Sequence, residues 1–259
     1  MTFTTHLLAP PSPASNPTTP PKFTLPTPTT PNPPTNPPLL TDALTIRQTV
    51  FIDEQHCSAE EEIDADDGRS WHWVVYHSPD APSTGTEGAT DRESAPPDAK
   101  EGSRTPVATI RLVPPPNVHS HHPNHSPNPN GAESGAEQAA EQDQEQEPYI
   151  KLTRVAVLRE YRGYGLGRAV VETALAWARE HAREIDEAAV AFAFATASAK
   201  KDGGEVVARP VWDGLVLVHA QTQVEKMYER CGFVTDEGMG RWDENEIEHL
   251  GMWRRLVLE

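Results

Sequence analysis

Residues 150–183, IKLTRVAVLREYRGYGLGRAVVETALAWAREHAR, decide the fold of this chain. The segment begins within an apolar, β-branched run that predicts a strand over residues 149–158. A glycine-rich turn follows, and apolar residues then recur three and four positions apart from Leu166 onward. That spacing predicts an amphipathic helix over residues 166–183. A strand, a glycine-rich loop and a helix in this order are typical of a binding site for a phosphate group.

The glycine-rich loop has the properties of an anion site. Glycines at positions 163, 165 and 167 tolerate positive φ angles and let the backbone approach a ligand. The free amides at the start of the helix and the helix dipole both attract negative charge. Three arginines add positive charge in an otherwise acidic chain: Arg159, Arg162 and Arg168. We therefore predict that the loop binds a pyrophosphate, with a glycine-rich turn that binds nothing as the simpler alternative.

Two other phosphate-binding folds fit the segment less well. A Rossmann dinucleotide site needs an acidic residue at the end of a second strand about 20 residues further on, and none is found there. The strand is also preceded by predicted hairpin strands. An ATP-binding P-loop needs the sequence Gly-Lys-Ser/Thr, which this loop lacks.

The rest of the chain completes an α/β pattern. Thr41 or Asp42 is predicted to cap a helix that reaches Val50. A short helix is predicted over residues 222–231. Further strands are predicted at residues 71–76, 107–113, 215–219, 233–234 and 249–258. Hairpin strands come first and crossover helices later, and this order predicts a mixed antiparallel and parallel sheet with flanking helices.

Composition limits how much of the 259 residues can fold. Only 36% of the residues are apolar, and the 26 prolines cluster in a few segments. Residues 1–38 are rich in proline and threonine and are predicted to be a disordered tail, although short apolar spots leave an edge strand open. One folded domain is predicted over residues 39–259. Three segments in it are expected to be disordered insertions: residues 78–105, 114–148 and 185–213.

Charge and cysteine content narrow the class of partner. The formal net charge of −17 argues against nucleic-acid binding, which needs clustered lysines and arginines, and favours an amine-bearing partner. Two cysteines cannot form a disulfide scaffold, and no apolar run is long enough to span a bilayer. The N-terminus also lacks a leader pattern. We expect a protein of the cytoplasm or the nucleus, monomeric or homodimeric, with no membrane or nucleic-acid partner.

Two motifs resemble those of a known superfamily. The pattern RxxGxG at residues 162–167, after an apolar strand, resembles the acyl-CoA-binding signature of the GNAT N-acetyltransferases. The pattern YxxxGF at residues 228–233 resembles the second mark of that superfamily. Four shorter segments are similar to its ElaA-like branch: residues 50–55, 62–67, 220–221 and 248–252.

This resemblance implies a GNAT-like α/β fold in which two central strands splay apart and acetyl-CoA lies in the gap as a co-substrate. The splayed strands would be residues 150–158 and 215–219. Pantetheine amides would pair with the backbone of Val155, Ala156 and Val157, as an added strand does. The pyrophosphate would be held by the loop and the first helical turn: Arg162, Gly163, Tyr164, Gly165, Leu166, Gly167 and Arg168.

The resemblance also implies direct attack of a neutral amine on the thioester. Tyr228 matches the position of the tyrosine that usually protonates the leaving thiolate. The superfamily often places a glutamate or a water relay on the central strand as the base. This strand has Lys151, Thr153 and Arg154 instead, so the base does not follow from the resemblance.

The acceptor side is predicted from acidic and histidine residues outside the loop. The candidates for the base that takes the amine proton are Glu54, Asp64, Asp67, His219 and His249, and of these Glu54 and His219 are assigned to catalysis. Four residues are expected to bind a cationic acceptor: Glu54, Asp64, Asp67 and His249. The histidines within residues 119–125 are interpreted as part of a solvated loop, so no metal is expected.

The function predicted from these features is acetyl transfer from acetyl-CoA to a primary amine of a small molecule, such as a cationic amine or an amino sugar. Two alternatives stay open. In the first, the acceptor is a protein N-terminus or a lysine side chain. In the second, the chain is a non-catalytic module that binds CoA and recruits partners through its proline-rich tail.

Overall fold

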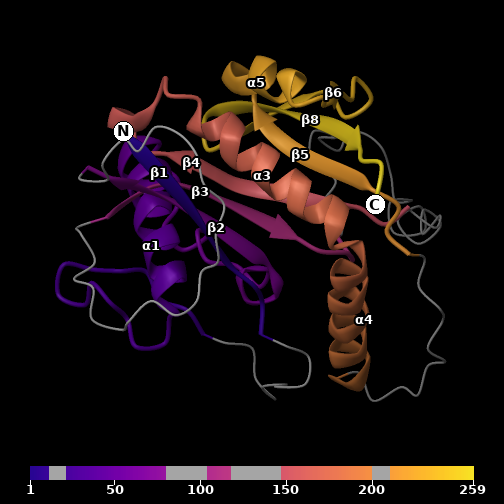
Figure 1. The fold of residues 1–259 in the computed structure, drawn as a ribbon, viewed down its shortest axis with the longest axis horizontal. Helices are drawn as coiled ribbons and strands as arrows, with labels where there is room; N and C mark the ends of the chain where they lie inside the picture. Colours follow the sequence, from indigo (N-terminus) through magenta and orange to yellow (C-terminus); the bar gives the residue numbers. More distant parts are fainter. Residues whose placement is uncertain (12–21, 80–103, 118–146, 200–210) are drawn as a thin grey trace, which may run out of the picture.

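A mixed β-sheet forms the centre of the molecule (Figure 1). The computed structural model describes residues 1–11, 22–79, 104–117, 147–199 and 211–259, and within these ranges the sheet has eight strands. The strand order is β1-β2-β3-β4-β5-β8-β6, and β7 pairs with β8 outside this path. The pair β4–β5 is parallel and the others are antiparallel. The strands are β1 Thr2–Leu8, β2 Trp71–Ser78, β3 Thr105–Val113, β4 Ile150–Val157, β5 Leu215–Gln221, β6 Val234–Thr235, β7 Arg241–Glu244 and β8 Ile247–Arg255.

Two helices pack against different faces of this sheet. Helix α1 (Pro38–Arg47) continues into a π-helical segment, Gln48–Glu54. Helix α3 (Leu166–Glu180) lies along the sheet, and α4 (Ala182–Ala199) follows it (Figure 1). The short α5 (Glu225–Arg230) comes after β5 and a 3-10 turn, Thr222–Val224.

Alternation along β2 separates two hydrophobic cores. Trp71, Trp73 and Val75 belong to the core under α3, whereas Val74 and Tyr76 belong to the core under α1. Successive residues of a strand point to opposite faces, so a strand covered on both sides has to be apolar throughout. All five side chains are buried. Coverage on both faces therefore explains why residues 73–76 of this strand form a continuous apolar run.

The two central strands separate after a short stretch of pairing. Strand β4 pairs with β5 from Ile150 opposite Val216 to Leu152 opposite Val218. Beyond this point β4 continues to Val157 and β5 to Gln221, and the ladder between them has ended. The predicted splay of the central strands is confirmed.

A β-bulge at Arg154 reorients the second half of β4. Arg154 has a φ of 54°, and the pairing of β4 with β3 shifts register beside it. Leu152 and Val155 both pack in the core under α3, although strict alternation would place them on opposite faces. An extra residue in one strand has this effect on the side chains that follow it. Before Arg154 the even-numbered residues of β4 therefore face the core under α3, and after it the odd-numbered residues do.

Part of the predicted disordered tail is ordered. Residues 2–8 form β1, an edge strand antiparallel to β2, so the prediction of disorder over residues 1–38 is wrong for this segment. Phe3 anchors the strand, with its ring centroid 5.5 Å from that of His77 and 6.5 Å from that of Tyr161. The backbone ladder and this contact offset the chain entropy on which the prediction was based. For residues 12–21 the prediction lies outside the described residues.

Helix α1 begins earlier than predicted, at Pro38. Proline suits the first helical position because it has no N–H to leave unpaired and its φ is already helical. The amide of Thr41 donates to the carbonyl of Pro37 (3.0 Å). Thr41 and Asp42 are therefore inside the helix, and the predicted cap at these residues is wrong.

The predicted helix over residues 166–183 is two helices that meet at His181. The second of them, α4, extends to Ala199, so the prediction of a disordered insertion over residues 185–213 is wrong for residues 185–199. Alanine has the highest helix propensity of all residues, and the buried Ile185 anchors the helix in the core. The insertions predicted at 78–105 and 114–148 fall mainly on residues 80–103 and 118–146, outside the described residues.

Buried ion pairs fasten the segment after α1 to the sheet. Arg47, fully buried in α1, contacts Glu62 (2.5 Å) and Asp67 (2.6 Å). Arg111 on β3 contacts Asp67 (3.1 Å) and Asp64 (2.6 Å). Burial raises the pKa of Asp67, but Arg47 and Arg111 outweigh burial and hold that pKa well below its usual range. Removal of one partner would leave a buried charge uncompensated, so this segment is fixed in place.

The buried His72 predicts how stability depends on pH. Burial lowers the pKa of His72 from 6.5 to about 4, and its Nε2–H donates to the backbone oxygen of Asp67 (2.9 Å). Between these two values the unfolded chain binds a proton that the folded chain does not. The free energy of unfolding is therefore full above pH 6.5 and falls as the pH drops toward about 4. At about 1.4 kcal/mol per pKa unit, the total loss is about 3 kcal/mol.

The variant His72→Gln should lose this component, because its amide can donate the same hydrogen bond without titrating. Denaturant unfolding at about pH 7 and about pH 4.5 measures the difference. The exposed His56 provides a matched control, and His56→Gln should keep the wild-type dependence on pH. An unchanged dependence in His72→Gln would contradict the assignment.

Candidate functional site

The gap between β4 and β5 opens into a cavity of about 950 Å³. Both strands line it, together with α5 and the loop at residues 161–168, except for Tyr164, a predicted cofactor residue that is exposed and outside this wall. The wall is completed by the turn between β7 and β8 and by seven residues after α1: Val50, Phe51, Gln55, Cys57, Ser58, Glu61 and Glu62. The splay therefore creates a space in which the inner edges of two strands face a ligand instead of each other.

The predicted cofactor residues of β4 lie along this space. Val155, Ala156 and Val157 all line the cavity, past the point where β5 stops pairing with β4. The carbonyl oxygen of Val157 accepts a hydrogen bond from Nε of Arg162 (3.0 Å). The structure thus connects the strand edge directly with the glycine-rich loop.

The glycine-rich loop has the backbone geometry that the sequence predicts. Gly163 has a φ of 83° and Gly165 a φ of 78°, and both face open space. Helix α3 begins at Leu166, and the amide of Ala169 bonds to the carbonyl of Gly165 (3.0 Å). The amides of the first turn have no carbonyl one turn earlier in the helix, so they are available to an anion.

Positive charge gathers at the same end of the cavity. Arg162 and Arg168 line it, as predicted, and so does Arg230 from α5. The sequence analysis did not identify Arg230, because its position next to the loop depends on how α5 packs. Three guanidinium groups beside free amides form the most cationic part of the cavity wall in a chain of net charge −17.

Glu54 lies at this loop and does not line the cavity. Its carboxylate accepts a hydrogen bond from Nη2 of Arg162 (2.8 Å), and Arg159 lies 3.8 Å away. The structure thus places the Glu54 carboxylate against the loop arginine, and the roles of Glu54 as a base and acceptor ligand stay predictions. The sequence could not reveal this contact, because the pair joins residues 108 positions apart.

Tyr228 lies in the wall next to the loop. The side chain is 5% exposed, and its ring packs edge-on against Phe233 with centroids 5.6 Å apart. Burial, and to a lesser extent Cys231, raises the pKa of Tyr228 well above its usual range. The phenol consequently carries its proton at neutral pH. A buried phenol in a cavity wall can donate that proton to a ligand atom.

Two histidines line the other part of the cavity. His219 is on β5 and His249 on β8, and the ring of Trp242 lies 4.9 Å and 6.2 Å from theirs. Nδ1 of His249 is 2.8 Å from the carbonyl oxygen of Ile247 and must donate to it. In the neutral ring, Nε2 then keeps its lone pair. Both histidines are close enough to the cavity to exchange a proton with a ligand.

The structure does not bring the two predicted aspartates into the cavity wall. Asp64 accepts two hydrogen bonds from Arg111 (2.6 and 2.8 Å), and Asp67 is buried between Arg47 and Arg111. Their negative charges are compensated inside the protein. Asp64 and Asp67 are therefore outside the cavity wall, and their binding of a cationic acceptor stays a prediction.

Lys151 and Arg154 line the cavity from β4, although no role was predicted for them from the sequence. The available signal was the alternation in IKLTR, which places Lys151 and Thr153 on the face opposite Ile150 and Leu152. Arg154 already forms ion pairs inside the protein, since it lies 3.4 Å from both Glu62 and Asp64.

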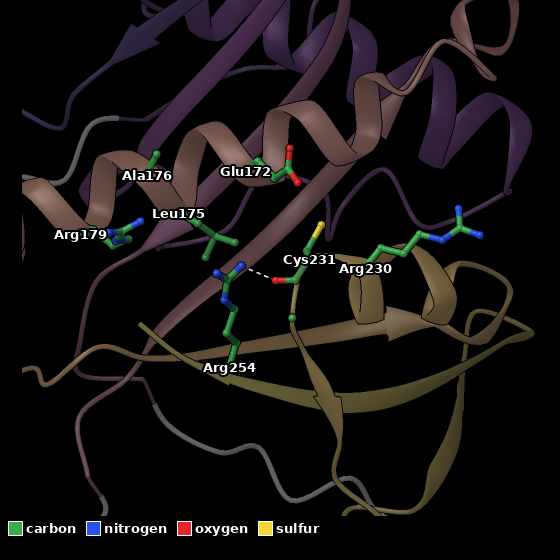
Figure 2. Close-up of a pocket in the computed structure, with 8 residues that line it drawn as sticks. Glu172, Leu175, Ala176, Arg179, Arg230, Cys231 and Arg254 are labelled. Carbon is green, nitrogen blue, oxygen red and sulfur yellow. Dashed lines mark hydrogen bonds between the residues drawn. The ribbon is translucent and has the colours of Figure 1, made fainter. Parts of the chain in front are cut away.

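A second cavity of about 400 Å³ lies between α3, α5 and β8 (Figure 2). Arg254 donates to the carbonyl oxygen of Cys231, and Arg179 donates to Val257 and Glu259. Figure 2 shows Arg179 and Arg230 at opposite ends of this pocket. The positive charges are therefore dispersed or already bound, and they do not form a single anion site.

Two further observations apply to the described residues. Among them, no group of three histidine, cysteine or acidic side chains is arranged to hold a metal ion. None of the helices in the same part of the chain has both the length and the apolar character that a membrane span requires.

Known proteins resemble this chain in sequence or in structure. The sequence model of the acetyltransferase (GNAT) family matches residues 65–197, slightly more than half of the chain. No curated protein sequence matches at a significant level. The solved structures that resemble it include a Lactobacillus plantarum protein described as an N-acetyltransferase (18% identity, 98% of this chain and 99% of that one, TM-score 0.47).

Two other solved structures are similar to a comparable degree. They are an acyl-CoA N-acyltransferase from Pseudomonas aeruginosa (21% identity, TM-score 0.43) and ElaA from Escherichia coli (17% identity, TM-score 0.40). Each alignment covers 83% of this chain and 89% of the other. Similarities of this size add nothing about the branch or the acceptor.

The loop geometry predicts opposite effects for two glycine substitutions. Gly165→Ala would force alanine to a φ of 78° and should cost about 1–2 kcal/mol of stability. Gly167→Ala is the matched control, because its Cβ would meet Val157 at an ordinary 3.8 Å and alanine favours the helix by about 0.5–1 kcal/mol. Denaturant unfolding measures both values. A Gly165→Ala protein as stable as the wild type would contradict the loop conformation.

Proposed function

Because the chain belongs to the acetyltransferase (GNAT) family, we propose that it transfers an acetyl group from acetyl-CoA to a primary amine of a small molecule. The family makes the protein an acyl-CoA-dependent acyltransferase. The nature of the acyl group, the acceptor and the roles of individual residues are our proposal.

One observation carries the proposal: the cavity runs from an anion site to a proton donor along a free strand edge. The anion site is the loop at residues 162–168, and the free edge is that of Val155–Val157. An extended pantetheine arm can pair with such an edge as an added strand. Its diphosphate would then lie at the amides of α3 and its thioester deeper in the gap.

The loop end matches the charge of the coenzyme. Arg162, Arg168 and Arg230 surround the anion site, and Glu54 fixes the direction of Arg162. Arginines suit phosphate oxygens because their guanidinium groups present paired donors. Glu54 is therefore a positioning residue in this proposal.

The chemical step needs three proton or charge movements. His219, the first residue of β5 beyond its pairing with β4, would take the proton of the amine directly or through a water molecule. The amine nitrogen then bonds to the carbonyl carbon, and a main-chain N–H near Val155 would stabilise the oxyanion. As the C–S bond breaks, Tyr228 would give its proton to the sulfur, and solvent would restore it.

Acetyl-CoA should stabilise the folded chain, whereas NAD should not. A ligand present at about 100 times its Kd adds about 2.7 kcal/mol, which is several degrees in Tm. Arg162→Gln should weaken this stabilisation, and Arg183→Gln, at an exposed position on α4 away from the cavity, should not. Absence of stabilisation by every CoA thioester would overturn the proposal.

Tyr228→Phe should lower kcat by about 100-fold, because the thiolate would leave without a positioned acid. Binding of acetyl-CoA, followed by thermal shift, should change little. Tyr149→Phe is the control, since Tyr149 is a buried tyrosine outside the cavity wall. Turnover is measured as CoA release with a panel of small amines, protein N-termini and lysine peptides. Equal kcat values for Tyr228→Phe and the wild type would remove Tyr228 from the mechanism.

CoA binding without transfer to any member of that panel would instead favour the non-catalytic module. Turnover with peptides alone would show that the acceptor is a protein N-terminus or a lysine side chain. The same assay therefore distinguishes the three functions that the sequence left open.

A further inference from the structure

Lys151 lies in the cavity wall without a partner. Its ammonium forms no hydrogen bond or ion pair with any residue that the structure describes. The side chain is half-buried near the start of β4, where the strand pairs with both β3 and β5. A charged group held in such a place is costly unless something compensates it.

The fold fixes where Lys151 points. Ile150 and Leu152 pack in the core under α3, so Lys151 projects from the other face of the sheet. Its neighbour on that face, Thr153, accepts a hydrogen bond from Arg111 (2.9 Å). The bulge at Arg154 ends this pattern, and the strand edge proposed for the pantetheine arm begins directly afterwards. Lys151 consequently faces the part of the cavity that lies beyond the thioester.

The other cations near Lys151 are already paired. Arg111 is bound to Asp64 and Asp67, and Arg154 lies against Glu62 and Asp64. Burial lowers the pKa of Lys151, and Arg111 and Arg154 lower it further, whereas Glu244 acts in the opposite direction. Of Lys151 and Arg154, the two β4 cations in the described cavity wall, Lys151 is the one that forms no ion pair.

Carboxylates lie at the rim of the same half. Glu61 comes from the segment after α1, Glu244 is the last residue of β7, and both are exposed cavity residues. The charge of Glu244 raises the pKa of Lys151, but no salt bridge between the two is found among the described residues. The half-cavity therefore has a cation in its wall and separate anions at its rim, which suits a ligand that carries both charges.

We propose that Lys151 binds the carboxylate of the acceptor, so that the acceptor is an amino acid or a similar small amine that carries a carboxylate. The inference rests on the proposed acyl transfer and names its substrate class. One ammonium matches a single negative charge, whereas a phosphate dianion is better served by paired arginine donors and would be repelled by Glu61 and Glu244. Lys151 is therefore a specificity-determining residue.

The test compares each amino acid with its own carboxamide as acceptor. Wild-type enzyme should prefer the carboxylate form, and Lys151→Met should reduce kcat/KM for that form by at least about tenfold, mainly through KM. The carboxamide should lose much less. Lys151→Arg should keep part of the preference, because it keeps the charge. The amino acid and its carboxamide differ in the intrinsic reactivity of their amines. Because the wild type and the variant are assayed with the same two acceptors, this difference cancels in the comparison between the two proteins.

Lys226→Met is the matched control, since Lys226 carries an equal charge at an exposed position of α5 outside the cavity. It should keep the wild-type preference. Acetyl-CoA should still stabilise Lys151→Met in a thermal shift, which shows that the variant is folded and that its coenzyme site is intact.

Two outcomes would overturn the inference. The first is a wild-type enzyme that turns over carboxylate and carboxamide equally. The second is a Lys151→Met enzyme that loses the same factor with both, as a base or a structural residue would. In either case, acetyl-CoA binding and turnover would leave the proposed function standing. Loss of coenzyme binding in the wild type itself would instead refute the proposed function.

Discussion

The parting of β4 and β5 is the constraint on which the rest of this structure depends. Two parallel strands that stop pairing after Leu152 and Val218 leave backbone donors and acceptors without their usual partners. Such groups are costly unless water or a ligand satisfies them, so the gap acts as a binding site by its nature. The loop at the start of α3 lies at the mouth of the same gap and offers free amides to an anion.

The gap has two chemically different halves because of one bulge in β4. Before Arg154 the strand places Lys151 in the cavity wall, on the face opposite the core under α3, and after it Val155 again packs under α3. Buried ion pairs around Arg47 and Arg111 hold the neighbouring segment, residues 62–67, against the sheet. These pairs also neutralise the acids of that segment. The cavity wall itself has five lysine or arginine residues and three glutamates, so its charge differs in sign from that of the chain.

Local patterns in the sequence predicted most of the fold. The β-branched runs predicted the central strands, and the glycines at 163 and 165 predicted the positive φ angles of the loop. The errors have common causes. The strand β1 was not predicted because its composition is typical of disorder, whereas its stability comes from pairing with β2. The helix α4 was not predicted because the pattern of its alanine-rich segment is ambiguous. For the site, the loop and Tyr228 could be predicted from short motifs, whereas Glu54, Asp64 and Asp67 were assigned to the cavity by residue type alone.

The sequence by itself determined the strand, the glycine-rich loop and the helix that follows it, because backbone conformation there depends on residues next to each other in the chain. Only the tertiary structure decided which charged side chains remain free. Glu54 meets Arg162 across 108 positions, and Asp67 meets Arg47 across 20, so both carboxylates are used inside the protein. Lys151 takes no part in this long-range pairing. Ion pairing depends on distances in space, and a linear pattern of charges does not contain them.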